Sequence, residues 1–199
     1  GNTKFVVTST GTLTIQPYTS WTSTFLDGSF FNFSGTLASG NFTGSSSFNE
    51  SKWVDINSME SLGGFTLGRS DNLTNSANNI SIDSPIEIAG PISIYGGDIT
   101  VSGNITSTLS GADVLLKASG NITTSASKNI TTNNGDIVFW SDSDSNGSGN
   151  IIIGDSNTFN TINGNTADEL SGGGNIILSG GLDNGDNGGL TSDGYPDGY

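Results

Sequence analysis

Short triplets of apolar, polar and apolar residues dominate the sequence between residues 80 and 105. Four are complete, and a fifth begins at Ile105: Ile80-Ser81-Ile82, Ile86-Glu87-Ile88, Ile92-Ser93-Ile94 and Ile99-Thr100-Val101. Strict alternation places both apolar side chains of each triplet on one face of a strand. The triplets start six or seven residues apart, which leaves no room for hairpin arms or helices. This spacing predicts a chain that coils around its own core, a β-solenoid with about 20 residues per turn.

The pattern continues beyond residue 110 with longer intervals between the apolar runs. The further predicted strands are Asp113–Lys117, Asn121–Thr123, Asn129–Thr131, Asp136–Trp140, Asn150–Ile153 and Asn175–Leu178. Glycine followed by Asp or Asn precedes many of them, as in Gly97-Asp98 and Gly120-Asn121. Glycine permits a left-handed corner, and the Asx side chain satisfies the amides that the corner exposes. Residues 65–181 are therefore predicted to form an all-β, parallel β-helix, right-handed by the crossover rule.

Residues 1–64 differ from the rest because aromatic side chains are concentrated there. A strand is predicted at Gly11–Ile15, and the aromatics include Trp21, Phe31, Phe42 and Trp53. In a β segment such residues are typical of a capping subdomain that covers the open end of a solenoid. A platform for stacking sugar rings is the alternative interpretation. The sequence thus predicts an aromatic-rich N-terminal cap.

Two further segments complete the predicted organisation. Trp53, Ile56 and Met59 recur at intervals of three, which favours a short helix over residues 50–62. Residues 182–199 consist largely of Gly, Asp and Asn, the residues of turns, and read as a linker or tail. The chain begins Gly1-Asn2-Thr3 without Met or an apolar signal region, which suggests a piece of a longer secreted precursor.

Charge and composition exclude several classes of partner. The net charge is −14 with only five basic residues, whereas nucleic-acid binding requires Lys and Arg to contact phosphates. Hydrophobic residues make up 32% of the chain, and no apolar run reaches the 18 residues of a membrane span. Charged residues make up only 12%, and together with the regular Ile pairs this favours a thin core over disorder. We therefore expect no nucleic-acid partner and no membrane-spanning segment.

The residue types needed for most catalysis are missing. Without His or Cys, the Ser-His-Asp and Cys-His mechanisms and the common zinc sites are excluded. A polysaccharide hydrolase or lyase remains the enzymatic alternative, and it requires carboxylates such as Asp98, Asp113 and Asp136 to converge in one groove. The only arginine, Arg69, is expected to pair locally with Asp71 or with a corner carbonyl. An ice-binding solenoid is a further alternative, because some solenoids display ranks of Thr. The favoured reading is a protein that is not an enzyme.

A candidate calcium loop lies at residues 141–148. The run Asp142-Ser143-Asp144-Ser145-Asn146-Gly147 places oxygen ligands at alternate positions, with a glycine for the sharp turn. Ile153 occupies the twelfth position, where a calcium loop carries a bidentate Glu, and Asp155 is the expected substitute. The alternative is a solvated corner in which Asx side chains cap main-chain amides, and this alternative is favoured. The predicted metal ligands are Asp142, Asp144, Asn146 and Asp155.

Four motifs are similar to those of a known group of proteins. They are Gly11-Thr12-Leu13-Thr14-Ile15, Leu67-Gly68-Arg69-Ser70-Asp71, Ile94-Tyr95-Gly96-Gly97-Asp98-Ile99 and Gly135-Asp136-Ile137-Val138-Phe139-Trp140-Ser141-Asp142. They resemble the filamentous-haemagglutinin-like regions of very large bacterial surface proteins. The resemblance implies a right-handed β-helix within a secreted adhesin or fibre at the cell surface. It implies no catalytic residues, and its expected partners are glycans of host or neighbouring cells, or other copies of the chain.

Overall fold

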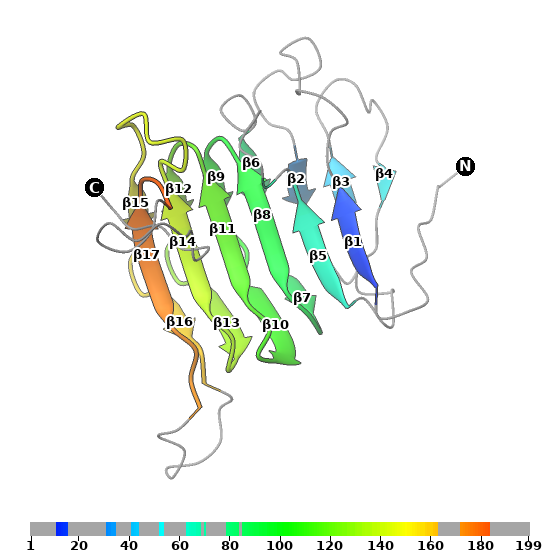
Figure 1. The fold of residues 1–199 in the computed structure, drawn as a ribbon. Coiled ribbons are helices and arrows are strands. Elements are labelled where there is room, and N and C mark those ends of the chain that lie inside the picture. The colour runs from blue at the N-terminus through cyan, green and yellow to red at the C-terminus, as the bar shows by residue number, and fades with distance from the viewer. Residues whose placement is uncertain are drawn as a thin grey trace.

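Three β-sheets make up the structure, a computed structural model that describes residues 11–15, 31–34, 41–43, 52–53, 63–68, 70, 79–83, 85–162 and 172–183 (Figure 1). The six strands of sheet A are, in spatial order, β1 (Thr12–Ile15), β5 (Gly64–Leu67), β8 (Ile92–Gly96), β11 (Val114–Ala118), β14 (Ile137–Ser141) and β17 (Ile176–Gly180). Sheet B contains β6 (Ile80–Ile82), β9 (Ile99–Val101), β12 (Ile122–Thr124) and β15 (Ile151–Ile153), and sheet C contains β7 (Ile86–Ile88), β10 (Ile105–Ser110), β13 (Asn129–Asn133) and β16 (Thr158–Asn160).

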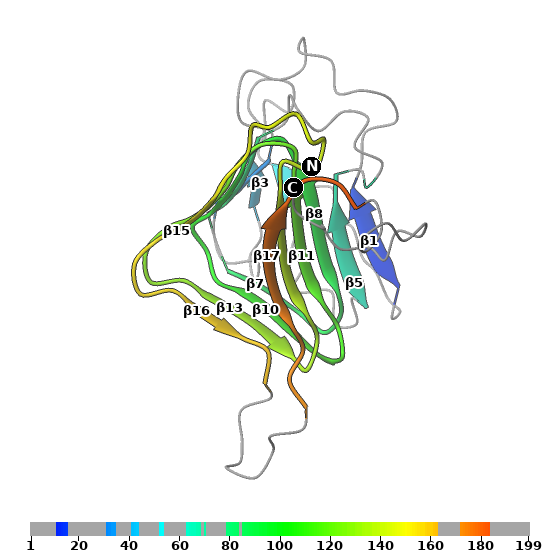
Figure 2. The same cartoon turned by 60° about the vertical axis from the view of Figure 1, so that its left-hand side comes forward.

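The chain visits sheets B, C and A in the same order four times. We call each circuit a rung; the four rungs are β6-β7-β8, β9-β10-β11, β12-β13-β14 and β15-β16-β17. Every strand of one rung pairs in parallel with the equivalent strand of the next rung, and the sheets enclose a common interior (Figure 2). This repeating order confirms the predicted all-β, parallel solenoid.

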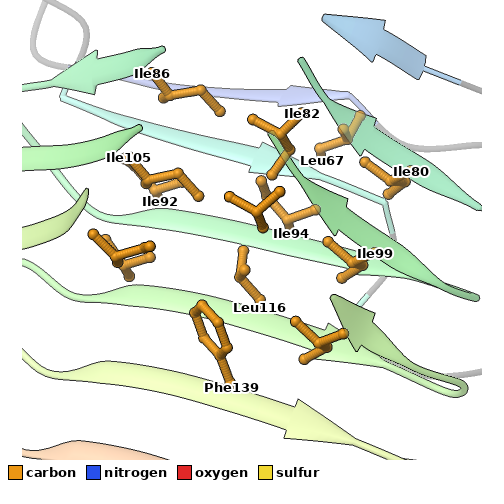
Figure 3. Close-up of a cluster of buried hydrophobic side chains, with 14 of the residues drawn as sticks. Leu67, Ile80, Ile82, Ile86, Ile92, Ile94, Ile99, Ile105, Leu116 and Phe139 are labelled. Atoms are coloured by element: carbon orange, nitrogen blue, oxygen red, sulfur yellow. The ribbon is translucent and has the colours of Figure 1, made fainter. Parts of the chain in front are cut away.

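The core consists of columns of inward side chains that run through the stack. In sheet A, one column is Leu13, Phe65, Ile92, Val114, Ile137 and Ile176. Isoleucine and related residues from all three sheets meet in the interior, as Figure 3 shows for Ile82, Ile94 and Ile105. Each fully buried aliphatic side chain contributes about 1.5–3 kcal/mol. The alternation seen in the sequence therefore supplies the main stabilising contacts.

Hydroxyl side chains take the place of Ile88 of β7 in the later rungs, at Ser107 in β10, Thr132 in β13 and Thr161 just after β16. Ser107 donates a hydrogen bond to the carbonyl oxygen of Gly90, at 2.8 Å, and Thr161 donates to Gly174, also at 2.8 Å. Thr132 donates to the carbonyl of Gly135 in the same way. A buried hydroxyl is costly without a partner, and here each one is satisfied by a corner carbonyl. These residues anchor the corner that leads from sheet C to sheet A.

That corner also requires small residues, because the rungs approach closely there. A Cβ atom added to Gly135 would lie 2.1 Å from the carbonyl oxygen of Ala112, and one added to Gly174 would lie 2.1 Å from that of Gly135. Gly90 meets Gly63 in the same manner. Backbone therefore stacks on backbone at this corner, which explains the glycine before Asp136 and before Asn175. The left-handed backbone predicted for the Gly-Asx corners is wrong: the described glycines with positive φ are Gly68, Gly111, Gly147 and Gly181, and none of them precedes Asp or Asn.

The segment before residue 64 contributes strands to the same sheets. The predicted strand at Gly11–Ile15 is confirmed as β1, which pairs with β5. Strand β2 (Phe31–Ser34) pairs in parallel with β6 and extends sheet B through the antiparallel strands β3 (Asn41–Thr43) and β4 (Lys52–Trp53). Two residues of the predicted 50–62 helix are thus in a strand, and the helix prediction is wrong for them. Pairing with β3, which no local pattern reveals, overrides the helical spacing.

Among the residues whose side chains the structure describes, there is no aromatic cluster near the N-terminus. Most of the aromatic-rich stretch predicted as a cap lies outside the described residues, as do Arg69, Asp71 and most of the predicted tail. Rung length also varies more than the opening triplets suggest: the sheet B strands of the four rungs start at residues 80, 99, 122 and 151. Longer corners in the later rungs account for the difference.

Candidate functional site

The polar residues with the most regular geometry lie where sheet A leads into sheet B, the AB corner. The main-chain N–H of Asp98 donates to Oδ1 of Asn79 at 2.9 Å. The N–H of Asn121 donates to Oδ1 of Asp98 at 2.7 Å, and that of Asn150 to Oδ1 of Asn121 at 3.0 Å. Each side chain therefore receives the amide of the equivalent residue one rung further on. We call this series the AB ladder.

Equivalent links occur at the two other corners. Between sheets C and A, the N–H of Asp136 donates to Asp113 at 2.7 Å, and the N–H of Asn175 donates to Asp136 at 2.6 Å. Between sheets B and C, the N–H of Asn129 donates to Asn104 at 3.0 Å. The Asx residues predicted to satisfy corner amides do so, and the amides belong to the neighbouring rung.

The carboxylates named for the enzymatic alternative are separated by this arrangement. Asp98 belongs to the AB ladder, whereas Asp113 and Asp136 lie on neighbouring rungs at the corner between sheets C and A. Each of the three accepts a main-chain amide at 2.6–2.7 Å. The three carboxylates therefore lie at two different corners, and one oxygen of each, Oδ1, accepts an amide of the next rung.

The candidate calcium loop is the longest described AB corner, between β14 and β15. Asp142 has a left-handed backbone, with φ of 48°, and its side chain is only 1% exposed. Its carboxylate accepts hydrogen bonds from three main-chain amides, those of Asn146 at 3.0 Å, Gly147 at 3.2 Å and Ser148 at 3.4 Å. The acid therefore lies inside its own loop and orders it.

The other predicted calcium ligands are only partly brought together. Asp144 is exposed and accepts from the side-chain amide of Asn146 at 2.9 Å, so that Asn146 presents N–H rather than oxygen to it. Asp155 lies at the opposite end of β15, in the corner that leads to sheet C, where its carbonyl oxygen accepts from Ser127. Among the described residues, no three acidic side chains lie close enough to hold a metal. Calcium binding here stays a prediction.

A small polar cavity lies beside this loop. Its volume is about 120 Å³, and its lining includes Asn79, Asp98, Ser119, Asp144, Asn146 and Ser148. The loop from the third rung thus reaches back over the AB corners of the first two rungs. Asp98 and Asp144 supply the carboxylates of this cavity, and both already accept hydrogen bonds from neighbouring residues.

The outer face of sheet A carries a pair that the sequence did not reveal. The ammonium of Lys117 lies 3.6 Å from the centre of the Trp140 ring, and Trp140 donates its indole N–H to the carbonyl of Gly181 at 2.7 Å. Partial burial lowers the pKa of Lys117, and the negative charge of Asp183 acts in the opposite direction. Lys117 and Trp140 are neighbours only because β11 and β14 pair in register. Trp140 is covered by these contacts and offers no open face for a sugar ring.

Comparison of the chain with family models, curated proteins and solved structures finds no match. A helix long and apolar enough to cross a membrane is absent from the part of the chain that the structure describes.

Proposed function

We propose that the chain is a non-enzymatic structural or adhesive module of an extracellular or cell-surface fibre. In this role a right-handed β-helix, as in the filamentous-haemagglutinin-like regions that the sequence resembles, provides a rigid body whose stability comes from contacts between neighbouring rungs. Its partners would be cell-surface glycans or further copies of the chain. The localisation follows from the same resemblance.

One observation carries the proposal: the Asx side chains at the corners are used to connect rungs. Asp98, Asp113 and Asp136 each accept a main-chain amide of the next rung. A general acid or base must instead present its carboxyl group to a substrate. The most regularly placed polar side chains therefore hold neighbouring rungs together, which is the role that a fibre module requires of them.

The test combines location with activity. Antibodies against the purified chain should label intact cells of the source organism, and incubation with neutral and acidic polysaccharides should release no reducing ends. Labelling that requires permeabilised cells would contradict the proposal. Cleavage that is lost in an Asp98→Asn or Asp136→Asn variant would establish the polysaccharide-cleaving alternative instead.

A second candidate, ice binding, is favoured by one observation. Outward threonines stack in register on all three sheets: Thr14 against Thr66 on sheet A, Thr100 against Thr123 on sheet B and Thr106 against Thr131 on sheet C. Such ranks repeat at the ~4.8 Å strand spacing. They are one residue wide and only two threonines long, ending at Ile152 on sheet B and Asn160 on sheet C. Thermal hysteresis of the purified chain would support ice binding, and the absence of thermal hysteresis would contradict it.

A further inference from the structure

The end of the solenoid formed by the fourth rung leaves its inward side chains exposed. Ile176 and Leu178 of β17 are 47% and 45% exposed, and Ile153 of β15 is 39% exposed. Their partners one rung earlier in sheet A, Ile137 and Phe139, are fully buried. Within the described residues, β17 is also the edge of sheet A, with no strand on its outer side. Unpaired strand edges and exposed apolar side chains together form a surface suited to another strand.

The corner ladders show which direction that strand must run. Asn150 and Asn175 are the last residues of their ladders, and within the described part of the chain nothing donates to their Oδ1 atoms. In the preceding rungs the donor is always the amide at the entry of a parallel strand. An occupant that satisfies these oxygens is therefore parallel to β17, like every other strand of sheet A.

The opposite edge of the same sheet presents a matching strand. Among the described strands β1 is the other edge of sheet A, and its Leu13 lies in the inward column that ends at Ile176. Placing β1 of a second copy beyond β17 continues this column and sets Thr14 beside Ile177. Leu13 is only partly buried, so it also gains contacts.

The charge distribution favours head-to-tail contact over contact between two identical ends. Residues 1–69 contain three of the five basic and four of the nineteen acidic residues, and so carry −1 of the net charge. Residues 70–199 carry the remaining −13. The described residues of the fourth rung, 151–162 and 172–183, include Asp155 and Asp183 and no basic residue, so contact between two fourth-rung ends would set like charges against each other.

We propose that the fourth-rung end of one copy binds the β1 edge of another, so that sheet A continues from β17 into β1 of the next molecule. Such a heterologous contact does not close on itself and builds a filament. The inference rests on the proposed fibre function and names the partner, a second copy of this chain. Because the copies share a negative charge, association strengthens with added salt, which screens their repulsion.

Sedimentation velocity of the full 199-residue chain over a range of protein and salt concentrations tests this contact. The mean mass should rise with both. Leu178→Asp should weaken association by at least about tenfold, since burial of a leucine corresponds to one to two decades in affinity. Ile152→Asp is the matched control, because Ile152 is 52% exposed in the same rung but faces outward, and it should associate like the unaltered chain. Circular dichroism confirms that both variants fold.

Disulfide trapping distinguishes head-to-tail contact from contact between identical ends. Because the chain contains no native cysteine, only the introduced cysteines can form cross-links. Parallel neighbours lie ~4.8 Å apart, within the Cα range of a disulfide. The double variant Thr14→Cys, Ile177→Cys should give disulfide-linked dimers and higher oligomers, and each single variant should form no covalent dimer. Oxidised dimers of Ile177→Cys alone would show contact between identical ends and overturn the proposal. A strictly monomeric chain at high protein and salt concentration would also overturn it, while leaving the proposed surface function standing.

Discussion

At the scale of single residues, asparagine and aspartate are equivalent in the AB ladder. Asn79, Asp98, Asn121 and Asn150 occupy the same place on successive rungs, and the first three accept the amide of the next. The requirement is one oxygen at the right distance, which both side chains supply. Glycine precedes the last three of these residues, and a Cβ on Gly149 would lie 2.7 Å from the carbonyl oxygen of Gly120 in the preceding rung. The Gly-Asx dipeptides are therefore explained by rung contacts.

The first prediction separates the acceptor from the charge. Asp98→Ala removes the partner of the Asn121 amide, and we expect it to lower the free energy of unfolding by about 1–3 kcal/mol. Asp98→Asn keeps the oxygen and should change the stability by less than about 0.5 kcal/mol. Urea unfolding of both variants measures the difference, with Glu87→Ala, at an exposed outward position, as the control. Equal losses for Ala and Asn would show that the charge of Asp98 matters instead.

At the scale of elements, the loop between β14 and β15 is organised by one buried acid. The three amides around Asp142 supply the positive ends of their dipoles to its carboxylate, which replaces lost hydration. Asp144, two residues later, is exposed. The alternation of acids that suggested a calcium loop thus corresponds to one acid inside the loop and one at its surface.

The second prediction concerns this loop. Asp142→Ala leaves three amides without their acceptor, and we expect the melting temperature to fall by several degrees. Asp144→Ala should have a much smaller effect because Asp144 is exposed. The hydrogen bonds of Asp142 involve no metal, so the fall in melting temperature should be the same in calcium and in a chelator. A calcium concentration of ~10 mM is suitable, because it lies well above the ~10⁻⁴–10⁻³ M range of weak calcium modules. A melting temperature that rises with calcium in the unaltered chain, but not in Asp144→Ala, would establish the calcium site.

At the scale of the whole molecule, stability depends on a residue's place in the stack. A side chain in the middle is covered by a rung on each side, whereas one in the fourth rung is covered on one side only. Ile137 and Ile176 occupy the same column, yet Ile137 is fully buried and Ile176 is 47% exposed. This nearest-neighbour arrangement is characteristic of repeat proteins.

The third prediction uses that matched pair. Ile137→Ala opens a cavity and should cost about 2–5 kcal/mol, the usual range for a buried large-to-small change. Ile176→Ala should cost less than about half as much, because much of its surface is already in water. Chemical unfolding at low protein concentration, where copies are apart, gives both values. Equal costs would mean that the fourth-rung end is covered in solution.

The sequence by itself determined the class of fold. Inward pairs such as Ile80 and Ile82 recur too often for helices or hairpins, so local alternation was sufficient to predict a parallel solenoid and most of its strands. The Gly-Asx dipeptides also marked the corners in the sequence, but their roles are set by the stack: the glycines admit the neighbouring rung, and the Asx oxygens accept its main-chain amides. The candidate loop at Asp142 was found from its residues alone.

Only the tertiary structure decided which residues meet across rungs. The links from Asp98 to Asn121 and from Lys117 to Trp140 join residues 23 positions apart, and that register depends on corner lengths that vary from rung to rung. Pairing with β3 likewise made Lys52–Trp53 a strand against its helical spacing. The separation of Asp155 from Asp142 follows from the straight strand between them. A strand's pattern specifies its buried face, whereas its neighbours are set by the cooperative stacking of the whole coil.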